Sequence, residues 1–143
     1  MVKIARSAYI HYSAKQMFDL VDDIEAYPEF LPWCQNTAVL ERTESSVTAS
    51  ICIQKSQFNK SFVTTNTLKR YENITMTLVE GPFRQLDGNW YFKDLDDEGS
   101  KITLNIEFEF KNRILGMTLG SFFEKSCNTL MDAFIQRAAQ VYE

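Results

Sequence analysis

The sequence predicts an α+β fold: a curved, seven-stranded antiparallel sheet wrapped around one long C-terminal helix, with two shorter helices after the first strand. Two observations carry this prediction. Apolar residues recur in steps of three and four along the last thirty residues, whereas most of the chain between residues 37 and 110 alternates apolar and polar residues. The loops between the alternating segments are short, which favours antiparallel neighbours over crossover connections.

The long helix is predicted from Arg113 to Glu143. At 1.5 Å per residue it would span about 40 Å. No proline interrupts it, and its two glycines, Gly116 and Gly120, fall in the first turns, where fraying costs least. Such a helix needs a partner surface for its apolar stripe. The stripe consists of Leu115, Leu119, Phe123, Cys127, Leu130, Met131, Phe134, Ala138 and Tyr142.

The N-terminal segment predicts one strand and two helices. The strand runs from Val2 to Ile10, and Arg6 falls on its apolar face. Arg6 is therefore either at an edge or in an ion pair, or it is a polar anchor inside a pocket. Ser13 and Gln16 have the spacing of a capping box that opens the first helix. A short second helix is predicted over Ala26–Leu31 because Pro28 suits the first turn of a helix and Pro32 ends it.

Six further strands are predicted by period-two alternation and by turn residues between the segments. The clearest covers residues 102–110, and it follows an acidic hairpin turn at Asp96–Gly99. One face of this sheet needs cover, and only the terminal helix is long enough to provide it. A space between a strongly curved sheet and one helix is a natural binding cavity. The other five strands cover 37–42, 47–53, 60–70, 74–78 and 86–92.

Composition bounds the classes of function. A length of 143 residues predicts a single domain, 1–143. The net charge of −4 argues against DNA as a partner held by bulk electrostatics and leaves a local basic patch open. Three cysteines without a CxxC pair favour buried thiols in a reducing compartment. No stretch has the length of a signal peptide core or a membrane span, so the cytoplasm is the expected location.

Catalytic machinery is not indicated. The only histidine, His11, lies at a strand-to-helix junction, where a surface or capping role is typical. Ser13 is explained as a helix cap, metal ligands are not clustered, and no phosphate-binding glycine loop occurs. The sequence therefore predicts neither catalytic residues nor a metal site, and no cofactor that the protein requires.

Large aromatic residues gather in three segments instead. Phe30 and Leu31 lie between Pro28 and Pro32, and Trp33 follows Pro32. Phe83 follows a Gly-Pro break, and Phe122 and Phe123 lie near the start of the long helix. They form either the rim of a cavity or a hydrophobic seal, and both interpretations remain open.

Several segments together resemble one family. YSAKQMFDLV at 12–21, YPEFLPWC at 27–34, GPFRQLDGNWYF at 81–92, FEFKN at 108–112 and LGSFFEK at 119–125 are similar to the START-like, helix-grip family. This family holds coenzyme Q-binding proteins and RatA-type ribosome-association toxins, and some members have the older label polyketide cyclase. The resemblance covers essentially the whole chain and implies a hydrophobic tunnel between the sheet and the C-terminal helix.

Three functions follow from the resemblance. The first is non-enzymatic binding of ubiquinone, another polyprenyl quinone or a lipid in support of respiration. It is compatible with transient membrane contact and a peripheral position at the inner membrane. The second is a toxin's binding to the large (50S) ribosomal subunit, which blocks subunit joining. The third is an aromatic or polyketide cyclase. For the first, the expected ligand-binding residues are Arg6, Phe30, Leu31, Pro32, Trp33, Phe83, Trp90, Phe108, Phe122, Phe123, Leu130 and Met131.

The first two functions require different polar contacts. Arg6 or Asn66 is expected to fix a quinone carbonyl. Ribosome binding would need a positive face, for which the cations are either gathered at one place or dispersed over the surface. These cations are Lys55, Lys60, Lys69, Arg70, Lys111 and Arg113.

Overall fold

Seven strands form one antiparallel sheet in the order β1-β7-β6-β5-β4-β3-β2. The computed structural model describes residues 1–96 and 98–143. The predicted α+β, helix-grip architecture is confirmed, and most strands are a few residues longer than the alternation alone indicated. Their bounds are β1 Val2–Ile10, β2 Cys34–Arg42, β3 Ser46–Lys55, β4 Phe58–Lys69, β5 Asn73–Glu80, β6 Phe83–Asp94 and β7 Ser100–Phe110.

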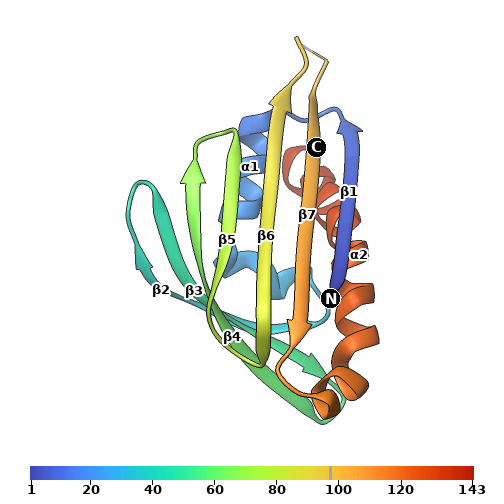
Figure 1. Ribbon diagram of the computed structural model, residues 1–143. Coiled ribbons are helices and arrows are strands. Elements are labelled where there is room, and N and C mark those ends of the chain that lie inside the picture. The colour runs from blue at the N-terminus through green and yellow to red at the C-terminus, as the bar shows by residue number, and fades with distance from the viewer. Residues whose placement is uncertain (97) are drawn as a thin grey trace.

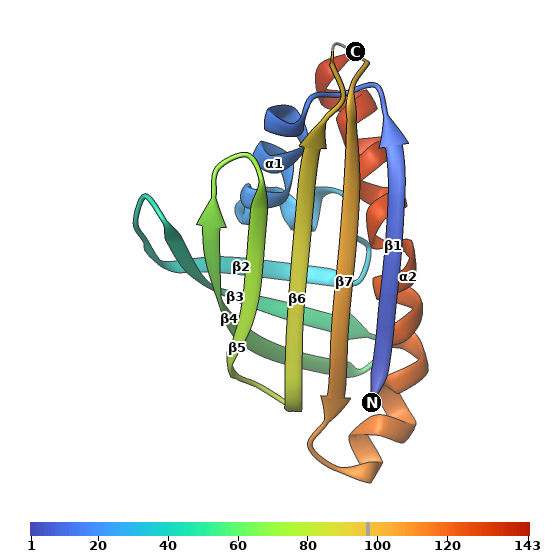
Figure 2. The ribbon, with the colours of Figure 1, turned by 45° about the horizontal axis from the view of Figure 1, so that its top comes forward.

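The sheet curls strongly around its long helix, α2 (Arg113–Tyr142). In Figure 2 strands β2, β3 and β4 run across the view, whereas β6, β7 and β1 run along it beside α2. Figure 1 shows α2 behind the sheet on its concave side, together with the two short helices. Consecutive strands pair from β2 to β7, and β1 closes the far edge against β7. The short helices therefore connect the two opposite edges of the sheet.

Side chains alternate between the two faces of the sheet along each strand, and one of these faces packs against α2. On β7 the isoleucine, leucine and phenylalanine side chains are buried, while Glu107 and Glu109 lie on the outer face, where they pair with Lys3 and Arg84. The helix contributes a matching stripe of buried residues. Its buried members are Leu119, Phe123, Ser126, Cys127, Met131, Phe134 and Ala138. This contact between sheet and helix is the core of the protein.

The first short helix, α1 (Ala14–Asp22), begins as predicted. Ser13 accepts the backbone N–H of Gln16, and the Gln16 side chain accepts the backbone N–H of Ser13. The second is a 3₁₀ helix, η1 (Ile24–Glu29), rather than the predicted helix over Ala26–Leu31. It begins directly after α1, so Ile24 belongs to it, and Pro28 lies inside it.

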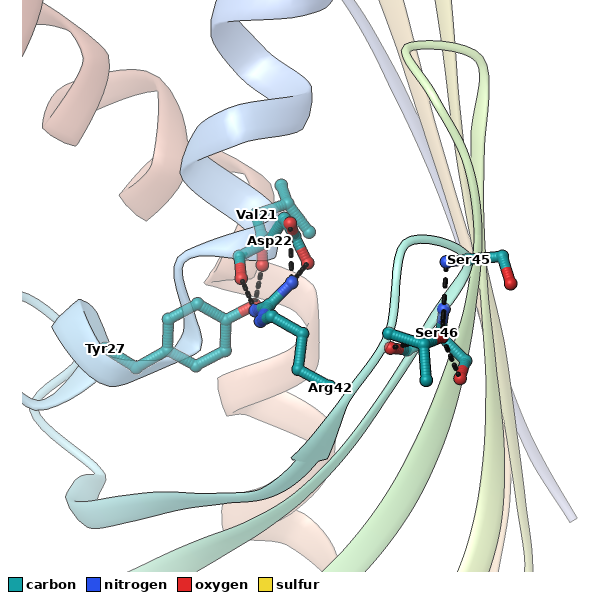
Figure 3. A network of polar contacts seen from close by, with 7 residues as sticks. Val21, Asp22, Tyr27, Arg42, Ser45 and Ser46 are labelled. Atoms are coloured by element: carbon teal, nitrogen blue, oxygen red, sulfur yellow. Dashed lines mark hydrogen bonds and ion pairs between the residues drawn. The ribbon is translucent and has the colours of Figure 1, made fainter.

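Polar contacts fix η1 between α1 and the outer edge of the sheet, as Figure 3 shows. Arg42, at the end of β2, donates to the Asp22 carboxylate at 3.0 Å and to the Asp22 carbonyl at 3.0 Å. The Tyr27 hydroxyl donates to the Val21 carbonyl. Burial raises the pKa of the Asp22 carboxyl despite the opposing effect of Arg42. These contacts orient the Tyr27 ring toward α2.

The hairpin between β6 and β7 packs against the corner between β1 and α1. The buried Ser100 hydroxyl donates to the Tyr12 carbonyl at 2.7 Å, and Asp94 accepts the backbone N–H of Ala14 at 2.8 Å. Gly99 has a positive φ of 97° in this hairpin. The predicted acidic turn at Asp96–Gly99 includes Asp97, which lies outside the described residues.

Candidate functional site

A cavity lies between the concave face of the sheet, η1 and the middle of α2. Its volume is about 80 Å³. Most of its wall is apolar, which suits a hydrophobic ligand group. We call it the inner cavity; it is lined by Ile24, Tyr27, Trp33, Ile51, Phe62, Thr64, Asn66, Met76, Leu86, Asp87, Gly88, Trp90, Ile106, Phe123, Ser126, Cys127, Leu130 and Phe134.

Two buried polar side chains from β4 face this cavity. The Thr64 hydroxyl donates to Asn66 Oδ1 at 3.0 Å, which leaves the Asn66 amide nitrogen as a free donor among the described hydrogen bonds. No fully buried side-chain nitrogen or oxygen of the described residues lacks a partner, so this nitrogen keeps contact with the cavity space. Asn66 can therefore donate to a carbonyl or hydroxyl oxygen of a ligand.

The inner cavity opens toward a second depression on the surface. We call this the outer groove; its volume is about 390 Å³, and it is lined by Pro32, Trp33, Gln54, Lys55, Ser56, Phe122, Lys125, Ser126 and Thr129. Trp33 and Ser126 line both spaces, so the half-buried indole lies at the boundary between them. Lys55 Nζ lies 5.3 Å from the centre of the Phe122 ring across the groove. The mouth therefore combines aromatic surface with positive charge.

Phe83 and Phe108 lie in a packed aromatic cluster and not on the cavity wall. Phe83 stacks on Phe110 with ring centres 4.7 Å apart and contacts Phe123 at 5.1 Å. Phe108 contacts Phe123 edge-on at 4.8 Å, and Phe62 completes the cluster. The expected cavity role of Phe83 and Phe108 is thus corrected. β6 and β7 pack tightly against α2 at this cluster, so these two residues form a hydrophobic seal and not the rim of a cavity.

Arg6 also lies outside the inner cavity, contrary to the interpretation as a polar anchor inside a pocket. It is exposed on the edge strand β1, and its guanidinium donates to Asn128 Oδ1 on α2 at 3.0 Å. Because β1 is the last strand, its central side chains on the helix side reach solvent beside α2. The interpretation as an edge position therefore holds, and Arg6 cannot fix a ligand in the inner cavity.

The other expected ligand-binding residues divide into three groups. Trp33, Trp90, Phe123 and Leu130 line the inner cavity. Phe30, Pro32 and Phe122 line grooves on the surface beside α2. Leu31 and Met131 are buried in the core and line neither space. The structure brings together only the first group, with Asn66 opposite.

Several lining residues were not singled out from the sequence. A usable signal existed for Phe62 and Thr64, since they alternate with Asn66, which was expected to contact a ligand, and must share its face of β4. No comparable signal existed for Gly88, whereas the flexible thioether of Met76 already suits an adaptable cavity lining. A Cβ atom on Gly88 would come within 2.4 Å of Met76 Cε, so a side chain there would require the flexible end of Met76 to shift.

The titratable groups around the cavity are not arranged for acid–base chemistry. Burial raises the pKa of the Cys127 thiol to about 12, so the thiol stays protonated at neutral pH. Asp87 is exposed on the outer face, where it accepts from Gln85. His11, which follows the end of β1, is exposed and does not line the inner cavity. The described residues contain no group of three or more potential metal ligands.

Membrane insertion by a helix finds no support in the described part of the chain, where none of the helices has the length and apolarity to cross a bilayer.

Comparisons with known proteins agree with this architecture. The profile of the family described as "Polyketide cyclase / dehydrase and lipid transport" matches residues 10–135. The ribosome association toxin RatA of Pseudomonas aeruginosa is 44% identical over 139 residues, which cover 97% of this chain and 96% of the toxin. The RatA protein of Vibrio cholerae is 42% identical over 142 residues, 99% of either chain.

Two more distant proteins widen the comparison. The mitochondrial coenzyme Q-binding protein COQ10 of Dictyostelium discoideum is 24% identical over 137 residues, which cover 93% of this chain and 67% of that protein. A START superfamily protein from Mycobacterium smegmatis has the same fold, with a TM-score of 0.80, 18% identity, and coverage of 97% of this chain and 98% of that one.

Proposed function

Since the chain belongs to the polyketide cyclase / dehydrase and lipid transport family, which has the START-like fold, we propose that it is a RatA-type ribosome-association protein. In this role it binds the large ribosomal subunit and hinders subunit joining without catalysing a reaction. The supporting observation is the identity of 42–44% to two RatA toxins over nearly the full length of both chains.

The size of the inner cavity also supports a function on the surface. Ligand pockets for drug-sized molecules enclose about 300–1,000 Å³. The inner cavity has about 80 Å³, so its walls already fill most of the space between sheet and helix. Ribosome association needs no such space, because the partner contacts exposed side chains.

Gradient sedimentation tests this proposal. Added in excess to a ribosome extract, the purified protein is expected to sediment with large subunits and to increase free subunits at the expense of joined ribosomes. A protein that stays at the top of the gradient, with joined ribosomes unchanged, would contradict the proposal.

A second candidate function is binding of a quinone or another apolar ligand in the inner cavity. It is supported by the apolar lining, by the free Asn66 donor and by the similarity to a coenzyme Q-binding protein. Burying an isoprenoid chain would contribute roughly 25 cal/mol per Å² of apolar area. At about 80 Å³ the cavity is smaller than the engineered cavity of about 150 Å³ that binds benzene, so its walls must move to admit a ligand.

Quinone retention tests the second candidate. Protein purified natively from a quinone-producing host is expected to release a quinone into organic solvent, detected by mass spectrometry. Gly88→Leu is expected to lower this yield at least about tenfold, because the new side chain occupies the space beside Met76. Gly116→Leu is the matched control, since no atom lies within 4 Å of a Cβ there.

The unmodified protein and the two glycine variants together decide whether the ligand proposal stands. Unmodified protein that contains no quinone or lipid, or equal yields from both variants, would remove the ligand proposal and leave ribosome association standing. No specific observation favours the third function, a cyclase: among the described residues, the cavity lining contains no histidine, and its one carboxylate residue, Asp87, is exposed and accepts from Gln85.

A further inference from the structure

Charge is divided unevenly between the two ends of the molecule. The β3–β4 hairpin, the β5–β6 turn, the β7–α2 loop and the start of α2 meet at one end, at the bottom of Figure 1. We call this the basic end; its charged residues are Lys55, Lys60, Arg84, Lys111, Arg113 and Lys125, with Glu80, Glu109 and Glu124. The rest of the chain has nine basic and sixteen acidic residues.

Direct contacts hold these elements together. The backbone N–H of Lys111 donates to the Pro82 carbonyl at 2.8 Å, and Gly81 packs against Phe62 of β4. Lys55 lies over Phe122 of α2, and Lys55 and Lys125 line the same outer groove. The cations therefore lie at the same end of the molecule, although they come from three separate parts of the sequence.

Most of these cations are free to bind a partner. Lys60, Lys111, Arg113 and Lys125 are exposed, and within the described residues none of them forms an ion pair. Arg84 differs because it pairs with Glu109 at 3.7 Å. By contrast, the cations near α1 are largely engaged, as in the Lys15–Asp19 and Arg42–Asp22 pairs.

We infer that the basic end is the surface that docks on ribosomal RNA, through contacts of Lys60, Lys111, Arg113 and Lys125 with backbone phosphates. This inference rests on the proposed function. A polyanion repels the acidic remainder of the chain and attracts only this end, so the charge distribution alone sets the orientation of docking. It also explains how an acidic protein with a net charge of −4 binds an RNA-rich particle.

The surface also carries two exposed apolar side chains, and they define the alternative partner. Ile114 and Met117, in the first turns of α2, are 74% and 79% exposed. RNA phosphates do not require apolar contacts, whereas an anionic membrane would bury both side chains and attract the same cations. Substitution of this pair therefore separates the two partners.

The test compares two triple variants with identical charge changes. Lys60→Glu, Arg113→Glu and Lys125→Glu reverse the basic end. Arg70→Glu, Lys93→Glu and Lys101→Glu reverse three cations that lie elsewhere and have no ion pair among the described residues. Binding to purified ribosomes is measured by co-sedimentation across a series of salt concentrations. The basic-end variant is expected to bind at least about tenfold more weakly, with a salt slope smaller by about 2–3.

The outcomes separate this inference from the proposed function. If the unmodified protein binds ribosomes and both triple variants lose affinity equally, the basic end is not the docking surface, while ribosome association stands. If the unmodified protein does not bind ribosomes, the proposed function fails first. If it instead floats with vesicles of anionic phospholipid, and Ile114→Ser with Met117→Ser abolishes flotation, the partner is a membrane and the inference is overturned.

Discussion

Replacing Phe83 with alanine is expected to lower the free energy of unfolding by about 3–5 kcal/mol. Phe83 is 1% exposed and contacts four other phenylalanine rings, with centres 4.7–6.2 Å away. Removing the ring loses the free energy gained when the ring moves from water into the core. It also leaves a cavity at the point where β4, β6, β7 and α2 meet. The four surrounding rings come from three other elements, β4, β7 and α2, so they cannot collapse into this space without moving backbone.

Urea denaturation followed by circular dichroism measures this loss. Phe58→Ala is the matched control, because that ring is 41% exposed at the start of β4 and its removal is expected to cost less than about 1 kcal/mol. A Phe83 variant as stable as the Phe58 variant would show that the aromatic cluster is not the seal of this end of the core.

The fold could be predicted from the sequence because its two periodicities are nearly uninterrupted. On β7 every second residue from Ile102 to Phe110 is buried, and on α2 the buried residues keep helical spacing. The capping box at Ser13 fixed the start of α1 for the same reason: both partners lie within one turn. Local rules suffice where the contacts themselves are local.

The candidate site was less predictable because it depends on position along the helix. Period two puts Leu86 and Trp90 on one face of β6, whereas Phe83 shares that face only because of a register shift between Phe83 and Gln85. The alternation also does not show that α2 touches Phe83 and leaves space beside Trp90. Arg6 illustrates the same limit. The alternation of side chains along β1 indicates which face of the sheet Arg6 is on, but not that β1 is the exposed edge strand beside α2. The distance between sheet and helix is set by all the side chains between them.

Replacing Gly99 with alanine is expected to destabilise the protein by about 3 kcal/mol or more. Gly99 has a φ of 97°, which L-residues with a side chain rarely adopt, and its Cβ would lie 1.9 Å from the Ile10 carbonyl oxygen. That oxygen is backbone, so it cannot swing aside like the end of a side chain. The substitution must therefore separate the β6–β7 hairpin from the corner between β1 and α1, including the hydrogen bond that the buried Ser100 hydroxyl donates to the Tyr12 carbonyl.

The same substitution at Gly116 should have the opposite sign. Gly116 lies inside α2 with no atom within 4 Å of a Cβ position, so alanine gains helix propensity without a clash, worth up to about 1 kcal/mol. Thermal and urea unfolding of both variants measure the difference directly. Equal effects would mean that the conformation of Gly99 is not needed to hold the hairpin. Opposite signs would show that one glycine is required by its contacts, whereas the other only leaves the first turns of α2, beside the basic end, less stable than they could be.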